Sequence, residues 1–231
     1  MTTRILVWDL PTRLFHWALA SSFIGAFLTA ESERYRDIHE GLGYTMLGLL
    51  VFRLVWGVAG TRYARFREFV RGPATVVAYL RELALGRPRQ YTGHNPLGAW
   101  AIVALIASGV LVGASGWLLE FGVADTLFEE LHEASANAML ALVVVHVAGV
   151  ILVSLLHREN LVAAMWTGYK WGLPGAAIAR SQPIVALLLA TALTTFWAWT
   201  LLDHRSGSKG ERGIATVEGG HSVVLPKRDD D

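Results

Sequence analysis

Long runs of hydrophobic residues, separated by short polar segments, dominate the pattern of this chain. Five runs approach the roughly 17 to 25 residues that a helix needs to cross about 30 Å of hydrocarbon. They cover about residues 14–30, 39–60, 97–119, 132–156 and 183–202. Only helices and closed barrels satisfy the backbone inside lipid, and no strand-length segment here alternates polar with apolar positions. The pattern predicts an all-α membrane protein with one transmembrane domain, residues 1–202, and a polar tail, residues 203–231.

The basic residues mark one side of the membrane. The connection between the second and third runs, residues 61–93, holds seven arginines and two glutamates, whereas the connection before the fourth run holds four acids and no base. Cytoplasmic loops carry the basic excess, so we expect a multi-pass protein of a bacterial inner membrane with a cytoplasmic N-terminus and a periplasmic tail. The first run exceeds the about 7 to 15 residues of a signal-peptide core, so we expect it to be retained.

The composition of the chain limits which cofactors it can hold. The chain is 53% hydrophobic and 17% charged, whereas a soluble domain carries about 25% charge. It contains no cysteine, which excludes disulfides, iron–sulfur clusters, thiolate zinc sites and covalently attached c-type haem.

The arginine-rich connection has a second interpretation, because such segments also bind nucleic acid or anionic lipid. Its middle, ATVVAYLRELALG, predicts a short amphipathic helix with Arg81 and Glu82 exposed, suited to the inner leaflet. No nucleic-acid-binding motif accompanies it. We therefore expect contact with membrane lipid and no nucleic-acid partner.

Four of the eight histidines lie in the hydrophobic runs: His16, His39, His132 and His146. An ionisable residue inside a membrane span is costly, so it indicates function, although a single one also serves as an interhelical hydrogen-bond donor. His132 and His146 are 146 − 132 = 14 residues apart, which is nearly four turns and about 21 Å along one helix face. With alternating span directions, His39 lies at the depth of His132 near the exterior, and His16 at the depth of His146.

Two imidazoles at one depth could hold a metal ion, form part of a proton relay, or bind a haem iron. Zinc takes about four ligands, and the spans place no carboxylate beside these histidines. A relay would string acids with histidines, whereas here the acids lie at the span ends. A planar haem needs two imidazoles and room, which Gly41, Gly43 and Gly149 provide. Without cysteine, such a haem is b-type.

Two arginines lie where haem propionates would need cations. Arg13 is one turn before His16, and Arg53 is 53 − 39 = 14 residues beyond His39, near the inner pair. A buried arginine is costly unless it meets an anion such as a propionate. The alternative for Arg53, of equal weight, is a side chain that extends to the cytoplasmic interface. His94, in TGHNP, is expected to cap or anchor a turn.

The segments around these residues resemble the prokaryotic cytochrome b561 family, which includes the b-type cytochrome subunits of nickel–iron hydrogenases. The resemblance covers about residues 4–171 and is carried by VWDLPTRLFHW, HEGLGYTMLGLLVFRLVWG, TRYARFREFVRGP, GHNPLGAW and the segment from LHEASANAM to AMWTGYK. It implies a four-helix bundle with two non-covalent b haems. Their axial ligands would be the pairs His16/His146 and His39/His132. The fifth helix and the tail go beyond this four-helix core.

The resemblance also implies transmembrane electron transfer between quinone and an exterior partner: a dehydrogenase, a hydrogenase or a c-type cytochrome. The chain would then be the membrane subunit of an oxidoreductase, with no catalytic residue of its own. One alternative is superoxide oxidation with electrons passed to quinone, which the acidic exterior loops disfavour. Another is a haem-free transporter that uses the histidines as a proton relay.

Overall fold

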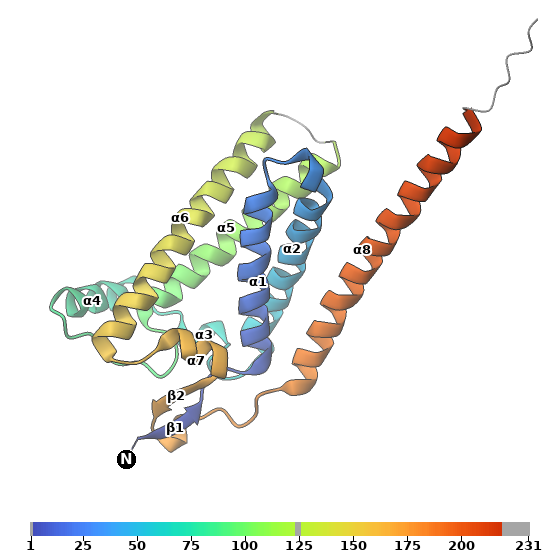
Figure 1. Ribbon diagram of the computed structural model, residues 1–231. Helices are drawn as coiled ribbons and strands as arrows, with labels where there is room; N and C mark the ends of the chain where they lie inside the picture. Colours follow the sequence, from blue (N-terminus) through green and yellow to red (C-terminus); the bar gives the residue numbers. More distant parts are fainter. Residues whose placement is uncertain (1, 123–125, 219–231) are drawn as a thin grey trace, which may run out of the picture. The chain divides into compact units, whose positions relative to one another are not determined.

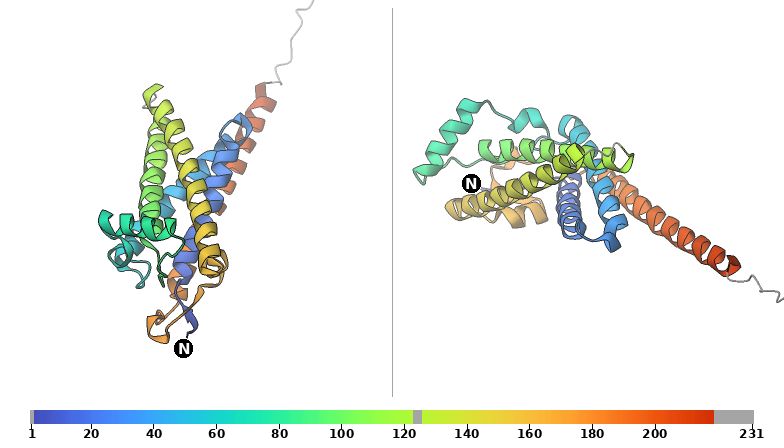
Figure 2. Two further views of the ribbon diagram at one scale, coloured as in Figure 1. Left: turned by 90° about the vertical axis from the view of Figure 1, so that its left-hand side faces the viewer. Right: turned by 90° about the horizontal axis from the view of Figure 1, so that it is seen from above.

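The computed structural model describes residues 2–122 and 126–218, with side chains up to residue 202. The chain divides into two compact units, Met1–Ala190 and Thr191–Asp231. Four long helices form the first unit: α1 (Leu10–Thr29), α2 (Arg36–Ala59), α5 (Pro96–Glu120) and α6 (Thr126–His157). Figures 1 and 2 show α1 running beside α2 and α5 beside α6, and α2 also packs on α5.

The bundle core holds Phe23, Ala26, Met46 and Met139, one cluster contributed by α1, α2 and α6. Small residues on α5 let its neighbours approach closely. A Cβ at Gly109 would lie 3.1 Å from Leu50, and one at Gly113 would lie 2.3 Å from Leu47. This agrees with close helix packing as the role of these glycines.

All five predicted spans are helices, but their ends differ from the prediction. Four segments are long and apolar enough to cross a membrane: Glu33–Ala59, Pro96–Glu120, Thr126–His157 and Pro183–Leu202. α1 has 20 residues and is not among them, because Arg13 and His16 lower its mean hydropathy. The membrane crossing by α1 therefore stays a prediction. α8 (Pro183–Glu218) continues as helix past residue 202, where we placed the start of the tail. The rest of that tail, residues 219–231, lies outside the described residues, as do residues 123–125 of the connection before α6.

Shorter elements gather around one end of the bundle. They are α3 (Phe66–Phe69), α4 (Pro73–Ala84), α7 (Leu161–Thr167) and η2 (Pro174–Ala176). The remaining short element, η1 (Glu33–Tyr35), lies at the other end, between α1 and α2. α4 is the predicted amphipathic helix. Its Tyr79 is buried whereas Val77 and Leu80 are exposed, which suits a helix lying on lipid.

A two-stranded ribbon, which the sequence did not predict, joins the start of the chain to its later part. β1 (Thr3–Leu6) pairs antiparallel with β2 (Tyr169–Gly172). Behind it, Ile5, Val7, Trp8 and Ala164 form a small apolar cluster. Four-residue strands are too short for a period-two pattern to distinguish them from coil.

Asp9 fixes the start of α1 against the end of α2. It is completely buried. Its carboxylate caps α1 by accepting the backbone N–H of Thr12 at 2.7 Å, and it also accepts Trp56 Nε1 and the hydroxyl of Thr61. These bonds compensate the burial of the charge. They hold the start of α1 against the end of α2, on the side of the arginine-rich connection (residues 61–93). His16 and Arg53 lie on this side.

Candidate functional site

The structure brings His39 and His132 together. Their ring centroids are 6.1 Å apart, with ring planes at 76°. Imidazole nitrogens bind metals at about 2.0 Å, so two rings on opposite sides of one metal ion have centroids about 6 Å apart. The His39/His132 pair therefore has the separation that would let both rings bind one metal ion from opposite sides. No group of three or more His, Cys, Asp or Glu side chains suited to a metal ion occurs within the described part of the chain.

Both rings are oriented by backbone carbonyls of neighbouring helices. His39 Nδ1 lies 2.9 Å from the carbonyl oxygen of Ala26, and His132 Nδ1 lies 3.0 Å from that of Val112. A carbonyl oxygen only accepts, so each Nδ1 carries the proton and donates. Each Nε2 then keeps its lone pair, which is the tautomer that metal-binding histidines adopt.

His16 and His146 are the second predicted pair. They lie close enough for their charges to interact. His16 packs edge-on against Trp17 with ring centroids 4.9 Å apart, and its Nδ1 is buried without a hydrogen-bond partner. The ligand role of this pair stays a prediction.

Arg53 is buried rather than extended to the interface. Only 3% of it is exposed. Its guanidinium lies 4.6 Å from the ring centre of Phe66, and Nη1 has no hydrogen-bond partner. Asp9 is the carboxylate whose charge acts on it. A buried guanidinium with a free donor is suited to an additional anion.

The other two predicted residues have different surroundings. One nitrogen of the Arg13 guanidinium donates to the carbonyl of Trp166, while its Nε is buried without a partner. A Cβ at Gly43 would meet no atom within 4 Å, and the same holds at Gly149. An added Cβ would thus meet open space at both glycines.

His94 lies near the inner pair, whose charges act on it. Its ring packs between Trp8 and Phe69, with centroids 4.6 and 4.5 Å away, so it anchors the turn as expected. The α5 cap is instead Asn95, whose Oδ1 accepts the N–H of Gly98 at 2.7 Å. Burial, reinforced by the nearby positive charge of Arg53, lowers the pKa of His94 to about 3. The ring is therefore neutral and uncharged beside the inner site.

Comparison with known proteins identifies the family to which the chain belongs. The family described as prokaryotic cytochrome b561 matches residues 7–168. The chain belongs to this family. Relatives named "Probable Ni/Fe-hydrogenase B-type cytochrome subunit" are 23% identical in Rhodobacter capsulatus, 25% in Azotobacter vinelandii and 24% in Cupriavidus necator. The matches cover 73%, 73% and 71% of this chain and 82%, 89% and 86% of the relatives. No solved structure matches it.

Membership in the cytochrome b561 family makes the chain a multi-pass membrane protein that carries electrons, with haem b as its cofactor. The donor set of this chain fits that group, because His39 and His132 offer Nε2 lone pairs at a suitable separation. The haem supplies a one-electron couple when bound. His39 and His132 would hold the group, and their Nδ1 contacts to backbone carbonyls would fix the orientation of both rings.

Gly116 offers a test of how tightly His132 is held. An added Cβ there would lie 2.9 Å from Cε1 of His132, so Gly116→Ala forces the ring away from the Val112 carbonyl. Loss of such an orienting contact weakens metal binding by about tenfold or more. We expect the variant to lose part of one haem during purification, measured by pyridine haemochrome. Gly48→Ala is the control, because its Cβ meets nothing within 4 Å; equal haem loss in both variants would contradict the prediction.

Proposed function

We propose that this protein carries electrons across the membrane through two b haems, between the quinone pool and a redox partner on the periplasmic side. His39 and His132 hold the outer haem, and His16 and His146 hold the inner one. The observation that carries the proposal is the outer pair: rings 6.1 Å apart, with both Nδ1 atoms bound to carbonyls. One ligand of each pair lies on α6, 14 residues apart, so the sites are separated by about 21 Å along that helix.

Each residue of the site has a defined task. The carbonyls of Ala26 and Val112 fix the tautomer of the outer ligands. Arg53 and Arg13 each offer a buried, unpartnered nitrogen near the inner pair, and we assign these to the inner propionates. Two haems at different depths would let an electron cross the insulating layer in shorter, successive transfer steps.

The partner follows from the relatives, whose names describe subunits of Ni/Fe hydrogenases. We propose an exterior partner of that kind, with a dehydrogenase or a c-type cytochrome as further candidates. Superoxide oxidation would need cations at the outer end. There Arg36 is paired with Glu40 at 2.9 Å and Arg34 lies over the ring of Tyr35, so this end offers few cations to attract an anion.

A visible spectrum of the purified protein tests the proposal. We expect an oxidised-minus-reduced difference spectrum of b type and two haems per chain by pyridine haemochrome. Mixing the reduced protein with a short-chain quinone should then reoxidise both haems. A colourless protein, expressed with sufficient haem, would contradict the proposal and favour the haem-free relay. A protein with haems that quinone does not reoxidise would contradict the quinone link alone.

A further inference from the structure

An open apolar groove lies between α2, α3 and α5. Its volume is about 400 Å³. Five apolar side chains and one arginine line it: Leu54, Phe66, Arg67, Val70, Val103 and Ile106. Leu54 and Val70 are 44% and 37% exposed, so the groove opens to the surroundings of the bundle. Among the described residues of its wall, Arg67 alone carries a charge. An apolar groove with one cation is suited to an amphiphile with an acidic head group.

The groove lies within one leaflet of the membrane. Leu54 is 59 − 54 = 5 residues before the end of α2, and Ile106 is 106 − 96 = 10 residues after the start of α5. At 1.5 Å per residue, they lie about 8 and 15 Å from these helix ends. Both helices are long and apolar enough to cross a membrane, whose hydrocarbon core is about 30 Å thick. Lipid tails of the leaflet on the side of the arginine-rich connection therefore surround the groove.

The position of Arg67 at the groove is fixed by its neighbour Phe66. The ring of Phe66 packs on the end of α2, where a Cβ at Gly57 would overlap it. The guanidinium of Arg53 lies 4.6 Å from the centre of the same ring. These contacts hold α3 against α2. Arg67, the next residue of α3, is thereby placed beside the apolar wall.

Positive charge exceeds negative charge around Arg67. Three arginines, Arg62, Arg65 and Arg67, share the carboxylate of Glu68, at 3.9, 3.7 and 3.8 Å. Exposed ion pairs of such length contribute little. The Arg67 side chain is 73% exposed. Its guanidinium is therefore accessible to a stronger anionic partner, and the neighbouring arginines attract the same anion.

Trp100 indicates that this charge lies at the level of the lipid head groups. It is near the start of α5, is 45% exposed, and donates from Nε1 to the backbone carbonyl of Arg71 at 2.9 Å. Exposed tryptophans with one polar contact are typical of the membrane–water interface. Arg71 follows Arg67 by four residues. A lipid phosphate at this level can reach Arg67 while its acyl chain enters the groove.

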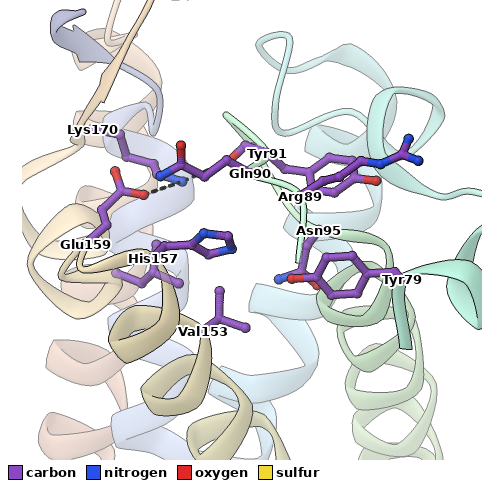
Figure 3. A pocket seen from close by; sticks show the side chains of 11 residues that line it. Tyr79, Arg89, Gln90, Tyr91, Asn95, Val153, His157, Glu159 and Lys170 are labelled. Atoms are coloured by element: carbon purple, nitrogen blue, oxygen red, sulfur yellow. Dashed lines mark hydrogen bonds and ion pairs between the residues drawn. The ribbon is translucent and has the colours of Figure 1, made fainter. Parts of the chain in front are cut away.

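A second cavity on the same side of the bundle has the opposite character. Its volume is about 30 Å³. Figure 3 shows His157 facing Tyr79 across the space, with Glu159 joined to Lys170 beside them. A polar space of this size accommodates water, whereas an acyl chain needs a long apolar surface. The groove between α2, α3 and α5 is therefore the one suited to a lipid.

We propose that the groove binds one anionic phospholipid, with its phosphate on Arg67 and an acyl chain along Leu54 and Ile106. Basic sites between membrane helices on the cytoplasmic side bind acidic lipid head groups. A zwitterionic lipid would bring an ammonium group toward Arg62 and Arg65, which repel it. The inference depends on the membrane location of the chain and is independent of haem number and of quinone.

The test measures single lipids bound to the intact, haem-loaded protein after delipidation in a neutral detergent. Dioleoylphosphatidylglycerol or dioleoylphosphatidylcholine is added, and native mass spectrometry counts the bound molecules. A neutral detergent presents no anionic surface, so only direct contacts contribute. The variants are Arg67→Gln at the head group and Ile106→Trp, which fills part of the groove. Their controls are Arg87→Gln, an exposed arginine of the same connection, and Ile151→Trp on the exposed side of α6.

We expect the native protein to bind one phosphatidylglycerol more tightly than phosphatidylcholine. Arg67→Gln should lower the affinity for phosphatidylglycerol by about fivefold, the usual contribution of one basic residue, and leave phosphatidylcholine binding unchanged. Ile106→Trp should weaken binding of both lipids by about tenfold, because an added ring overfills the site. Both controls should bind as the native protein does.

Three results would overturn the proposal. The first is a native protein without preference for phosphatidylglycerol. The second is equal loss in Arg67→Gln and Arg87→Gln, which would mean a diffuse effect of charge rather than a site. The third is displacement of the bound phosphatidylglycerol by decylubiquinone, which would assign the groove to a quinone. Haem content should stay native in every variant; if Ile106→Trp loses haem, Arg67→Gln with its control decides.

Discussion

Replacing either His39 or His132 by alanine is expected to remove the same haem and leave the other in place. Their ring centroids lie 6.1 Å apart, and each ring is anchored through Nδ1. No group of three or more His, Cys, Asp or Glu side chains suited to a metal ion lies among the described residues to replace a lost ligand. A haem held by one imidazole loses half of its protein bonds to iron. We expect the pyridine haemochrome value to fall from two haems per chain to about one, and electron transfer across the membrane to stop.

The single and double variants together identify the pairs. His39→Ala and His132→Ala should give the same spectrum as the double variant, whereas His16→Ala and His146→Ala should share a different one. His157→Ala is the control: it is a histidine at the end of α6 that belongs to neither pair, and both haems should remain. If His16→Ala and His132→Ala instead remove the same haem, the assignment of the pairs is wrong.

The outer pair could be predicted because it depends on helical geometry. Two histidines 14 residues apart share a face, and alternating span directions set the depths of His16 and His39. The sequence could not indicate what orients the rings. Their partners are backbone carbonyls of Ala26 and Val112, and any residue type would offer the same carbonyl. Such contacts depend on how two helices are placed and rotated against each other.

The surroundings of the inner pair were harder to predict for a different reason. His94, Glu159 and Lys170 come from segments between or after the spans, where no periodic pattern fixes their position. The β1–β2 ribbon brings Lys170 back to the start of the chain, and each of its strands has four residues. The segment GHNP did carry a signal. In this segment Asn95 caps α5 and Pro96 is its first residue. The start of the helix therefore explains Asn95 and Pro96 but not His94.

Replacing Arg53 by methionine is the prediction that distinguishes a haem contact from a structural contact. A positive charge stabilises a reduced haem relative to an oxidised one, so its removal lowers the reduction potential. At an effective dielectric constant of about 20, a unit charge about 10 Å away contributes about 1.7 kcal/mol. For a one-electron couple, in which a tenfold change corresponds to about 59 mV, this is a decrease of about 70 mV. A potentiometric titration should show the full decrease in one haem and about half of it in the other, which lies roughly twice as far away.

The control for Arg53→Met is Arg67→Met, because the Arg67 side chain is 73% exposed and solvent screens its charge. Arg53 also interacts with Asp9, whose carboxylate already accepts three hydrogen-bond donors. If Arg53 serves only to balance Asp9, then Arg53→Met lowers the thermal stability and leaves both potentials unchanged. If it serves the inner haem, the potential of that haem falls by about twice as much as that of the outer haem. Equal shifts in both haems would contradict either role, because a buried charge near the inner pair lies about 21 Å along α6 from the outer one.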